Sequence, residues 1–125
     1  NIISNYIKGK EIIISNPNNN TNLIDIEDVC SAIIYTIETN LDNSTLNVGG
    51  QNVSMKEFCE EVKNQVPKNN SSIIYGKDAA VKCSSMINAD KILSLGWQPK
   101  NSVKNIITAI VKSNKRKEYQ ITKDN

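Results

Sequence analysis

Residues 45–66 read TLNVGGQNVSMKEFCEEVKNQV, and this stretch decides the fold class. Its first four residues predict a short strand, which the pair Gly49-Gly50 closes. Ser54 and Glu57 then form a capping box, in which the hydroxyl accepts from an amide and the carboxylate reaches back to the Ser54 amide. The helix that follows carries one apolar stripe and ends before Pro67; the stripe consists of Met55, Phe58, Cys59, Val62 and Val66. A short strand leading into an amphipathic helix indicates a mixed α/β domain.

The segments before this stretch predict two further strands and a helix. Residues 2–7 have helical spacing and Gly9 follows as a stop. The β-branched run 12–14 predicts a strand, the asparagine-rich run 16–20 a loop, and 23–26 a second strand. The region upstream therefore has the same alternation of short elements.

The segment from Val29 to Ile37 predicts a helix with Asp28 at its N-cap. This helix is apolar nearly all round, so we expect both of its faces to be covered. In a chain of 125 residues, such coverage requires either a thick layer of partners or a neighbour that this chain lacks.

The downstream half predicts a strand, a loop and two helices. Residues 73–75 form the strand and 77–86 the loop, after which Asn88 caps a short helix that stops at Gly96. Ser102 caps a last helix whose apolar stripe consists of Val103, Ile106, Ile107, Ile110 and Val111. We expect 114–125 to be a frayed tail. The chain is thus predicted to be one small α/β domain, 1–125, with short strands and about four to five helices.

The composition of the chain excludes several classes of function. A formal net charge of +2 gives no strong field for nucleic acid or a membrane surface, and no apolar run is long enough to span a bilayer. The chain lacks histidine, which excludes Ser-His-Asp and Cys-His catalysis and His-ligated metal sites. Three widely spaced cysteines without a signal peptide are typical of reduced thiols in a cytoplasmic protein. Because the chain opens within an element, we expect a fragment or an expressed domain.

Four segments, in order, resemble a known family. They are residues 6–12, residues 23–29, residues 46–50 with 54–57, and residues 88–91 with Leu95-Gly96-Trp97-Gln98-Pro99. Their arrangement resembles the C-terminal third of the extended short-chain dehydrogenases, the NAD-dependent epimerases and dehydratases that act on nucleotide sugars. The resemblance covers about residues 6–111.

The resemblance implies the C-terminal lobe of a Rossmann-type enzyme, without the part that binds the cofactor. NAD or NADP would be bound by an absent N-terminal Rossmann domain, which also carries the family's catalytic Ser/Thr and Tyr/Lys residues. This chain alone is therefore expected to have no catalytic and no cofactor-binding residues. Its ligand would be a UDP-, dTDP-, GDP- or CDP-linked sugar, its partner the enzyme's own Rossmann domain, and the full enzyme could be a homodimer.

Three residues match substrate-side positions of the family. Thr21 falls where many members carry an arginine that contacts the nucleotide phosphates, although threonine supplies no charge. Lys82 is the best substitute for that charge, and a solvated loop lysine explains it equally well. Ser15 lies beside the strand that meets the base of the nucleotide. We interpret Asp28 as a cap and Trp97 as an apolar anchor of the last helix. Cys30 and Cys59 are predicted to be inert core thiols, with Cys83 in a polar loop.

The resulting hypothesis is the substrate-side portion of a nucleotide-sugar epimerase, dehydratase or reductase, which positions the sugar for hydride transfer. Two alternatives stay open. One is a free-standing, non-catalytic module that binds a nucleotide sugar or a protein. The other is a structural or nucleic-acid accessory protein based on the basic cluster Lys115-Arg116-Lys117, whose lack of interleaved aromatics favours a solvated helix end. The sequence does not indicate which sugar, nucleotide or reaction is involved, nor whether Thr21 means lost activity.

Overall fold

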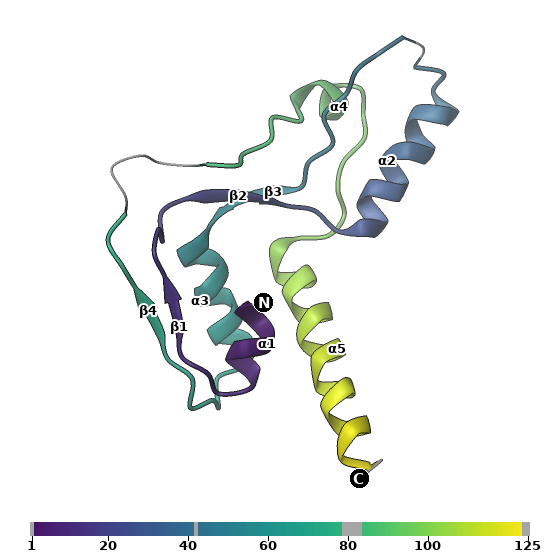
Figure 1. Cartoon of the computed structure of the whole chain (residues 1–125). Helices are drawn as coiled ribbons and strands as arrows, with labels where there is room; N and C mark the ends of the chain where they lie inside the picture. Colours follow the sequence, from purple (N-terminus) through teal and green to yellow (C-terminus); the bar gives the residue numbers. More distant parts are fainter. Residues whose placement is uncertain (1, 42, 79–83, 124–125) are drawn as a thin grey trace.

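A computed structural model of the chain describes residues 2–41, 43–78 and 84–123, of which 117–123 are described in backbone only. It confirms a mixed α/β fold with short strands (Figure 1). The elements in chain order are α1 (Ile2–Ile7), β1 (Ile12–Ile14), β2 (Asn20–Leu23), α2 (Ile26–Glu38), β3 (Gln51–Ser54), α3 (Met55–Gln65), β4 (Ile73–Tyr75), α4 (Asp90–Ser94) and α5 (Val103–Lys123).

The four strands form two separate pairs. β1 pairs in parallel with β4, with Ile12 opposite Ile73, whereas β2 pairs antiparallel with β3, with Thr21 opposite Val53. The connection between the parallel strands includes α2 and α3, as parallel strands require a long crossover. The short loop between β1 and β2 connects the β1–β4 pair to the β2–β3 pair, and it therefore lies between the two pairs.

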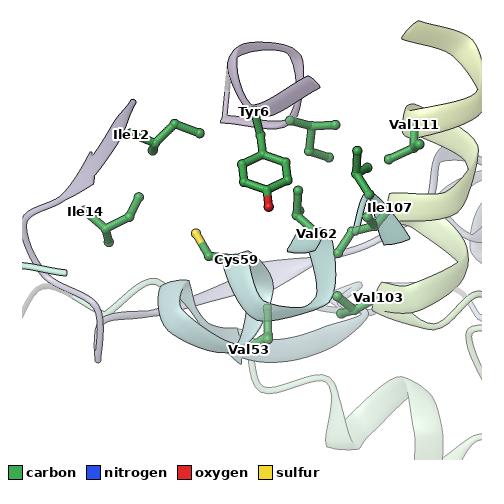
Figure 2. Packing of buried hydrophobic residues seen from close by; sticks show 11 residues of the cluster. Tyr6, Ile12, Ile14, Val53, Cys59, Val62, Val103, Ile107 and Val111 are labelled. Atoms are coloured by element: carbon green, nitrogen blue, oxygen red, sulfur yellow. The ribbon is translucent and has the colours of Figure 1, made fainter. Parts of the chain in front are cut away.

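The larger apolar core is built around α3. Figure 2 shows Tyr6 of α1 reaching toward Cys59 and Val62 of α3, with β1 on one side and α5 on the other. Burial alternates along β1, so that Ile12 and Ile14 face this core and Ile13 faces outward. The buried members of this core are Ile3, Tyr6, Ile12, Ile14, Val53, Cys59, Val62, Val66, Val103, Ile107 and Val111.

A second, smaller core is formed between α2 and α4, which lie at the end of the molecule away from α1 and β1 (Figure 1). Ala32, Ala89, Ile92 and Trp97 are buried together there, and the side chains of Leu46 and Val48 pack against them. Trp97 is buried as an apolar side chain, as predicted, but it packs with residues of α2 and α4 and not in the core that contains α5. Its indole N–H donates to the hydroxyl of Ser31 at 3.0 Å. Of the two cases expected for α2, the described residues do not supply a thick layer of partners, because Ile33 and Ile37 are 54% and 69% exposed.

Two predicted strands are displaced. The first lies at 20–23 rather than 23–26, and the second at 51–54 rather than 45–48. The four residues of β2 pair one to one with those of β3, so the ladder fixes both positions. No described strand pairs with 45–48, and an apolar segment without a ladder partner is not a strand.

Two of the predicted helix caps are formed and two are displaced. The Ser54–Glu57 capping box is present, and Ser102 accepts from Asn105 at the start of α5. The N-cap of α2 is Asp25 and not Asp28, because the helix begins at Ile26. The N-cap of α4 is Ala89 and not Asn88, although the side chain of Asn88 accepts from the Asp90 N–H. α5 runs to Lys123, since 103–123 contains neither glycine nor proline, and the fraying of 114–125 stays a prediction.

Candidate functional site

The candidate site lies at the edge where the parallel strands end. β1 ends at Ile14 and β4 at Tyr75, so Ser15 and Gly76 follow at the same edge of the pair. The two segments are in contact there, because the Gly76 N–H donates to the Ile14 carbonyl at 2.9 Å. Ser15, a predicted substrate-side residue, is exposed at this position. In α/β folds, the carboxyl edge of parallel strands is the usual location of a ligand site.

The loop between β1 and β2 is held on both sides. Asn18 donates from its backbone N–H and its side chain to the carboxylate of Asp78, at 3.1 and 2.5 Å. On the other side, the Pro17 and Asn19 carbonyls accept from the first backbone N–H groups of α3 at 2.8 and 3.0 Å. Because these N–H groups are already satisfied, the start of α3 does not provide a phosphate site.

Thr21 lies beside the returning segment that follows residue 83. It forms a parallel bridge with Ser85, whose N–H donates to the Asn20 carbonyl at 2.9 Å. The structure therefore brings Thr21 into contact with Ser85. Lys82 and Cys83 themselves lie outside the described residues, so their predicted roles stay predictions.

A network of asparagine side chains extends the site along the β2–β3 pair. Asn22 donates to the side chain of Asn52 at 2.8 Å and accepts from the Gly50 N–H at 3.0 Å. Asn52 in turn donates to the Ile87 carbonyl at 3.2 Å. Sequence reasoning did not identify this network, although Asn22 and Asn52 are register partners and could have been found once the pairing was known. The network fixes residues 85–87 against the sheet.

The clear pKa shifts of the described residues all lead away from neutral pH. Hydrogen bonds from the Ser54 backbone and hydroxyl lower the pKa of Glu57, and hydrogen bonds from Lys63 and Tyr75 lower that of Glu60. Burial raises the pKa of the Cys59 thiol to about 11, and burial and the Glu60 carboxylate raise that of Tyr75. None of these shifts produces a proton acceptor or donor suited to work near pH 7.

The polar face of α2 holds the segment before α5. Asp28 is 2% exposed, and its two carboxylate oxygens accept from the backbone N–H groups of Lys100 and Asn101 at 2.9 and 3.0 Å. One turn further along α2, the hydroxyl of Ser31 accepts from the indole N–H of Trp97. Two turns further along, the Tyr35 hydroxyl donates to the Leu95 carbonyl. Asp28 is therefore structural, as expected, but it clamps a distant segment instead of capping its own helix.

The two described cysteines differ in exposure. Cys59 is fully buried in the larger core, as predicted. The prediction for Cys30 is wrong, because it is exposed on α2. The sequence could not distinguish a covered from an uncovered face of this helix. Among the described residues, no three acidic or cysteine side chains gather to hold a metal ion, and no helix is long and apolar enough to cross a membrane.

Solved structures share this fold. The sequence matches no family model and no curated protein. The fold is that of the C-terminal lobe of NAD(P)-dependent epimerases, dehydratases and reductases acting on nucleotide sugars.

UDP-glucuronic acid 4-epimerase from Bacillus cereus is similar over 92% of this chain and 38% of its own, with a TM-score of 0.75 and 16% identity. GDP-mannoheptose C4 reductase from Campylobacter jejuni is similar over 89% and 34%, with a TM-score of 0.68 and 26% identity. A monomeric L-threonine 3-dehydrogenase from a metagenome is similar over 92% and 39%, with a TM-score of 0.67 and 18% identity. The chain spans less than two fifths of the length of these structures. The L-threonine 3-dehydrogenase among them shows that this fold alone does not determine the substrate.

Proposed function

We propose that this chain is the substrate-side lobe of an NAD(P)-dependent nucleotide-sugar epimerase, dehydratase or reductase. In this proposal Ser15 and Thr21 contact the nucleotide end of the sugar, and Lys82, which lies outside the described residues, supplies the charge for its phosphates. The Rossmann domain of the same enzyme binds the cofactor and carries the groups that oxidise the sugar.

The observation that carries the proposal is the shared fold over about nine tenths of the chain. Among the similar structures, the GDP-mannoheptose reductase combines that fold with 26% identity. The local geometry supports the same assignment, because the exposed Ser15 follows directly on β1 at the carboxyl end of the parallel pair, the usual location of a ligand site in α/β folds.

The contribution of such a lobe is orientation and exclusion of water. Hydroxyl and amide groups can hydrogen-bond a nucleotide without themselves exchanging protons in the reaction. Fixing a substrate in a reactive geometry lowers the barrier by up to about 7–11 kcal/mol in favourable cases. A lobe that only orients its ligand therefore accounts for a site whose exposed groups, such as the hydroxyl of Ser15, can hydrogen-bond but need not exchange protons.

Calorimetric titration tests the proposal. The native polypeptide that contains this sequence is titrated with UDP-, dTDP-, GDP- and CDP-linked sugars and with NAD(P), and the 125-residue chain is titrated with NAD(P) alone. We expect one nucleotide sugar and the cofactor to bind the native polypeptide, and no cofactor to bind the chain. Saturable binding of NAD to the chain at micromolar concentration contradicts the assignment, as does a native polypeptide that binds none of the nucleotide sugars.

A further inference from the structure

Residues 84–87, which lie between β4 and α4 in the chain, add an edge to the β2–β3 pair. Ser85 forms a parallel bridge with Thr21, and its N–H donates to the Asn20 carbonyl at 2.9 Å. Two residues later, Ile87 pairs with a side chain of β3 instead of with the backbone of a strand. We call residues 84–87 the added edge.

The partner of Ile87 is the carboxamide of Asn52. The Ile87 N–H donates to Oδ1 of Asn52 at 3.2 Å, and Nδ2 of Asn52 donates to the Ile87 carbonyl at 3.2 Å. The same Oδ1 accepts from Nδ2 of Asn22 at 2.8 Å, and the Asn22 carboxamide is itself fixed by the backbone of Gly50. A carboxamide carries a donor and an acceptor, as a peptide group does. The Asn52 side chain therefore takes the place of a strand residue opposite Ile87.

Hydrogen bonds hold the added edge more than burial does. All four of its residues are exposed, with Met86 and Ile87 at 59% and 39%. Apolar burial stabilises in proportion to the area removed from water, so these side chains contribute little within this chain. The position of Ile87 therefore depends on its two hydrogen bonds to Asn52.

Gly49 leaves the space that this pairing needs. A Cβ at residue 49 would lie 2.9 Å from Cγ2 of Ile87 and 3.2 Å from its Cβ. Carbon atoms in favourable contact lie about 3.5–4.0 Å apart, so a side chain at residue 49 would displace Ile87. Gly49 and Asn52 thus determine the position of Ile87 in two independent ways, one by space and one by hydrogen bonding.

We propose that Asn52 is a positioning residue for the nucleotide sugar, which acts through the added edge and not by contact with the ligand. The inference rests on the proposed function, which places the ligand at Thr21. Because Ser85 is a backbone neighbour of Thr21, the position of the added edge sets the shape of the site on that side. A segment that is already held in place loses less freedom when the ligand binds, and the affinity is higher for that reason.

Hydrogen exchange tests the positioning without a ligand. In the native polypeptide that contains this sequence, Asn52→Ala should accelerate exchange of the Ile87 amide at least about tenfold, because this amide loses its acceptor. Asn105→Ala, at an exposed position of α5, is the matched control and should leave that rate unchanged. The amide of Ile107, in the larger core, should exchange equally in all forms, which shows that each variant is folded. Equal exchange of Ile87 in the two variants overturns the proposal.

Calorimetric titration of the same proteins tests the consequence for the ligand. Asn52→Ala and Gly49→Ala should each weaken binding of the nucleotide sugar about tenfold. Binding of NAD(P), which the proposed function places on the Rossmann domain, should not change. A loss of both affinities shows a general structural effect and overturns the proposal. Equal nucleotide-sugar affinities of Asn52→Ala and Asn105→Ala overturn it and leave the proposed function intact. An unmodified polypeptide that binds no nucleotide sugar rejects the proposed function, and this inference with it.

Discussion

Oδ2 of Asp28 accepts a hydrogen bond at 3.0 Å from the backbone N–H of Asn101, a residue 73 positions further along the chain. Its other oxygen accepts from Lys100, so one buried carboxylate fixes the chain immediately before α5. Hydrogen bonds to a charged group are stronger than those between neutral groups. Together with Ser31 and Tyr35, this side chain therefore fixes the position of α5 relative to α2.

We expect Asp28→Ala to lower the free energy of unfolding by about 3 kcal/mol, because two backbone N–H groups lose a charged, buried acceptor. Asp25→Ala removes only the N-cap hydrogen bond to Glu27 and should cost about 1 kcal/mol. Urea unfolding of the two variants measures the difference. Equal losses, or a larger loss for Asp25→Ala, would show that the clamp at Asn101 does not exist.

The capping box makes the stability of α3 depend on pH. The Ser54 backbone N–H and hydroxyl both donate to Glu57, which holds its pKa below the ordinary value of 4.5. A carboxylate whose pKa is lowered in the folded state stabilises that state above its unfolded pKa, and the contribution disappears as the pH falls through the folded pKa. The carboxyl carbon of Glu57 should therefore titrate below 4.5 by NMR. Ser54→Ala should move the pKa of Glu57 back toward that value, and an unchanged titration would contradict the capping box.

The two described thiols should react at very different rates. Cys30 is exposed, whereas Cys59 is buried and its pKa is raised to about 11. Because the thiolate is the reactive form, Cys30 should react with a maleimide at pH 7 while Cys59 reacts only after unfolding. The experiment uses the chain with Cys83→Ser, so that mass spectrometry reports on these two thiols alone. Labelling of Cys59 at the rate of Cys30 in the folded chain is the contrary result.

Thr21→Arg tests where the phosphates lie. If Thr21 faces the pyrophosphate of the ligand, a guanidinium adds a charged, bidentate donor, and we expect about tenfold tighter binding of a UDP- or dTDP-linked sugar to the native polypeptide. Ser113→Arg, at an exposed position of α5, adds the same charge away from the site and should leave the affinity unchanged. Equal affinities of Thr21→Arg and the unmodified protein would mean that β2 presents this residue elsewhere.

The sequence predicted correctly those features that depend on neighbouring residues. The Ser54–Glu57 box and the Gly9 and Gly96 stops need no distant partner, and they lie where the sequence indicates. The β-branched run of β1 was also predicted, although its ladder partner is the distant strand β4. Both of these glycines have positive φ, 71° and 108°, a conformation that favours glycine. Such features can be read from a few neighbouring residues.

Features that depend on distant partners could not be predicted. The register of β2 and β3 is set by pairing across some thirty residues, and Asp28 is explained only by Lys100 and Asn101. The exposure of Cys30 depends on which side of α2 is covered, which the composition of the helix does not reveal. The roles of Ser15 and Thr21 stay predictions, and the Asn22–Asn52 network appears only with the register of β2 and β3.

The mass of the native product tests the central claim most directly. An antibody raised against this chain is used to detect the protein in its source cells, and the band is compared with the 13.9 kDa of the 125 residues. We predict a band heavier by at least one domain, on the order of 100–150 residues. A single band at 13.9 kDa would contradict the account, because the chain would then have no cofactor-binding part to complete the enzyme.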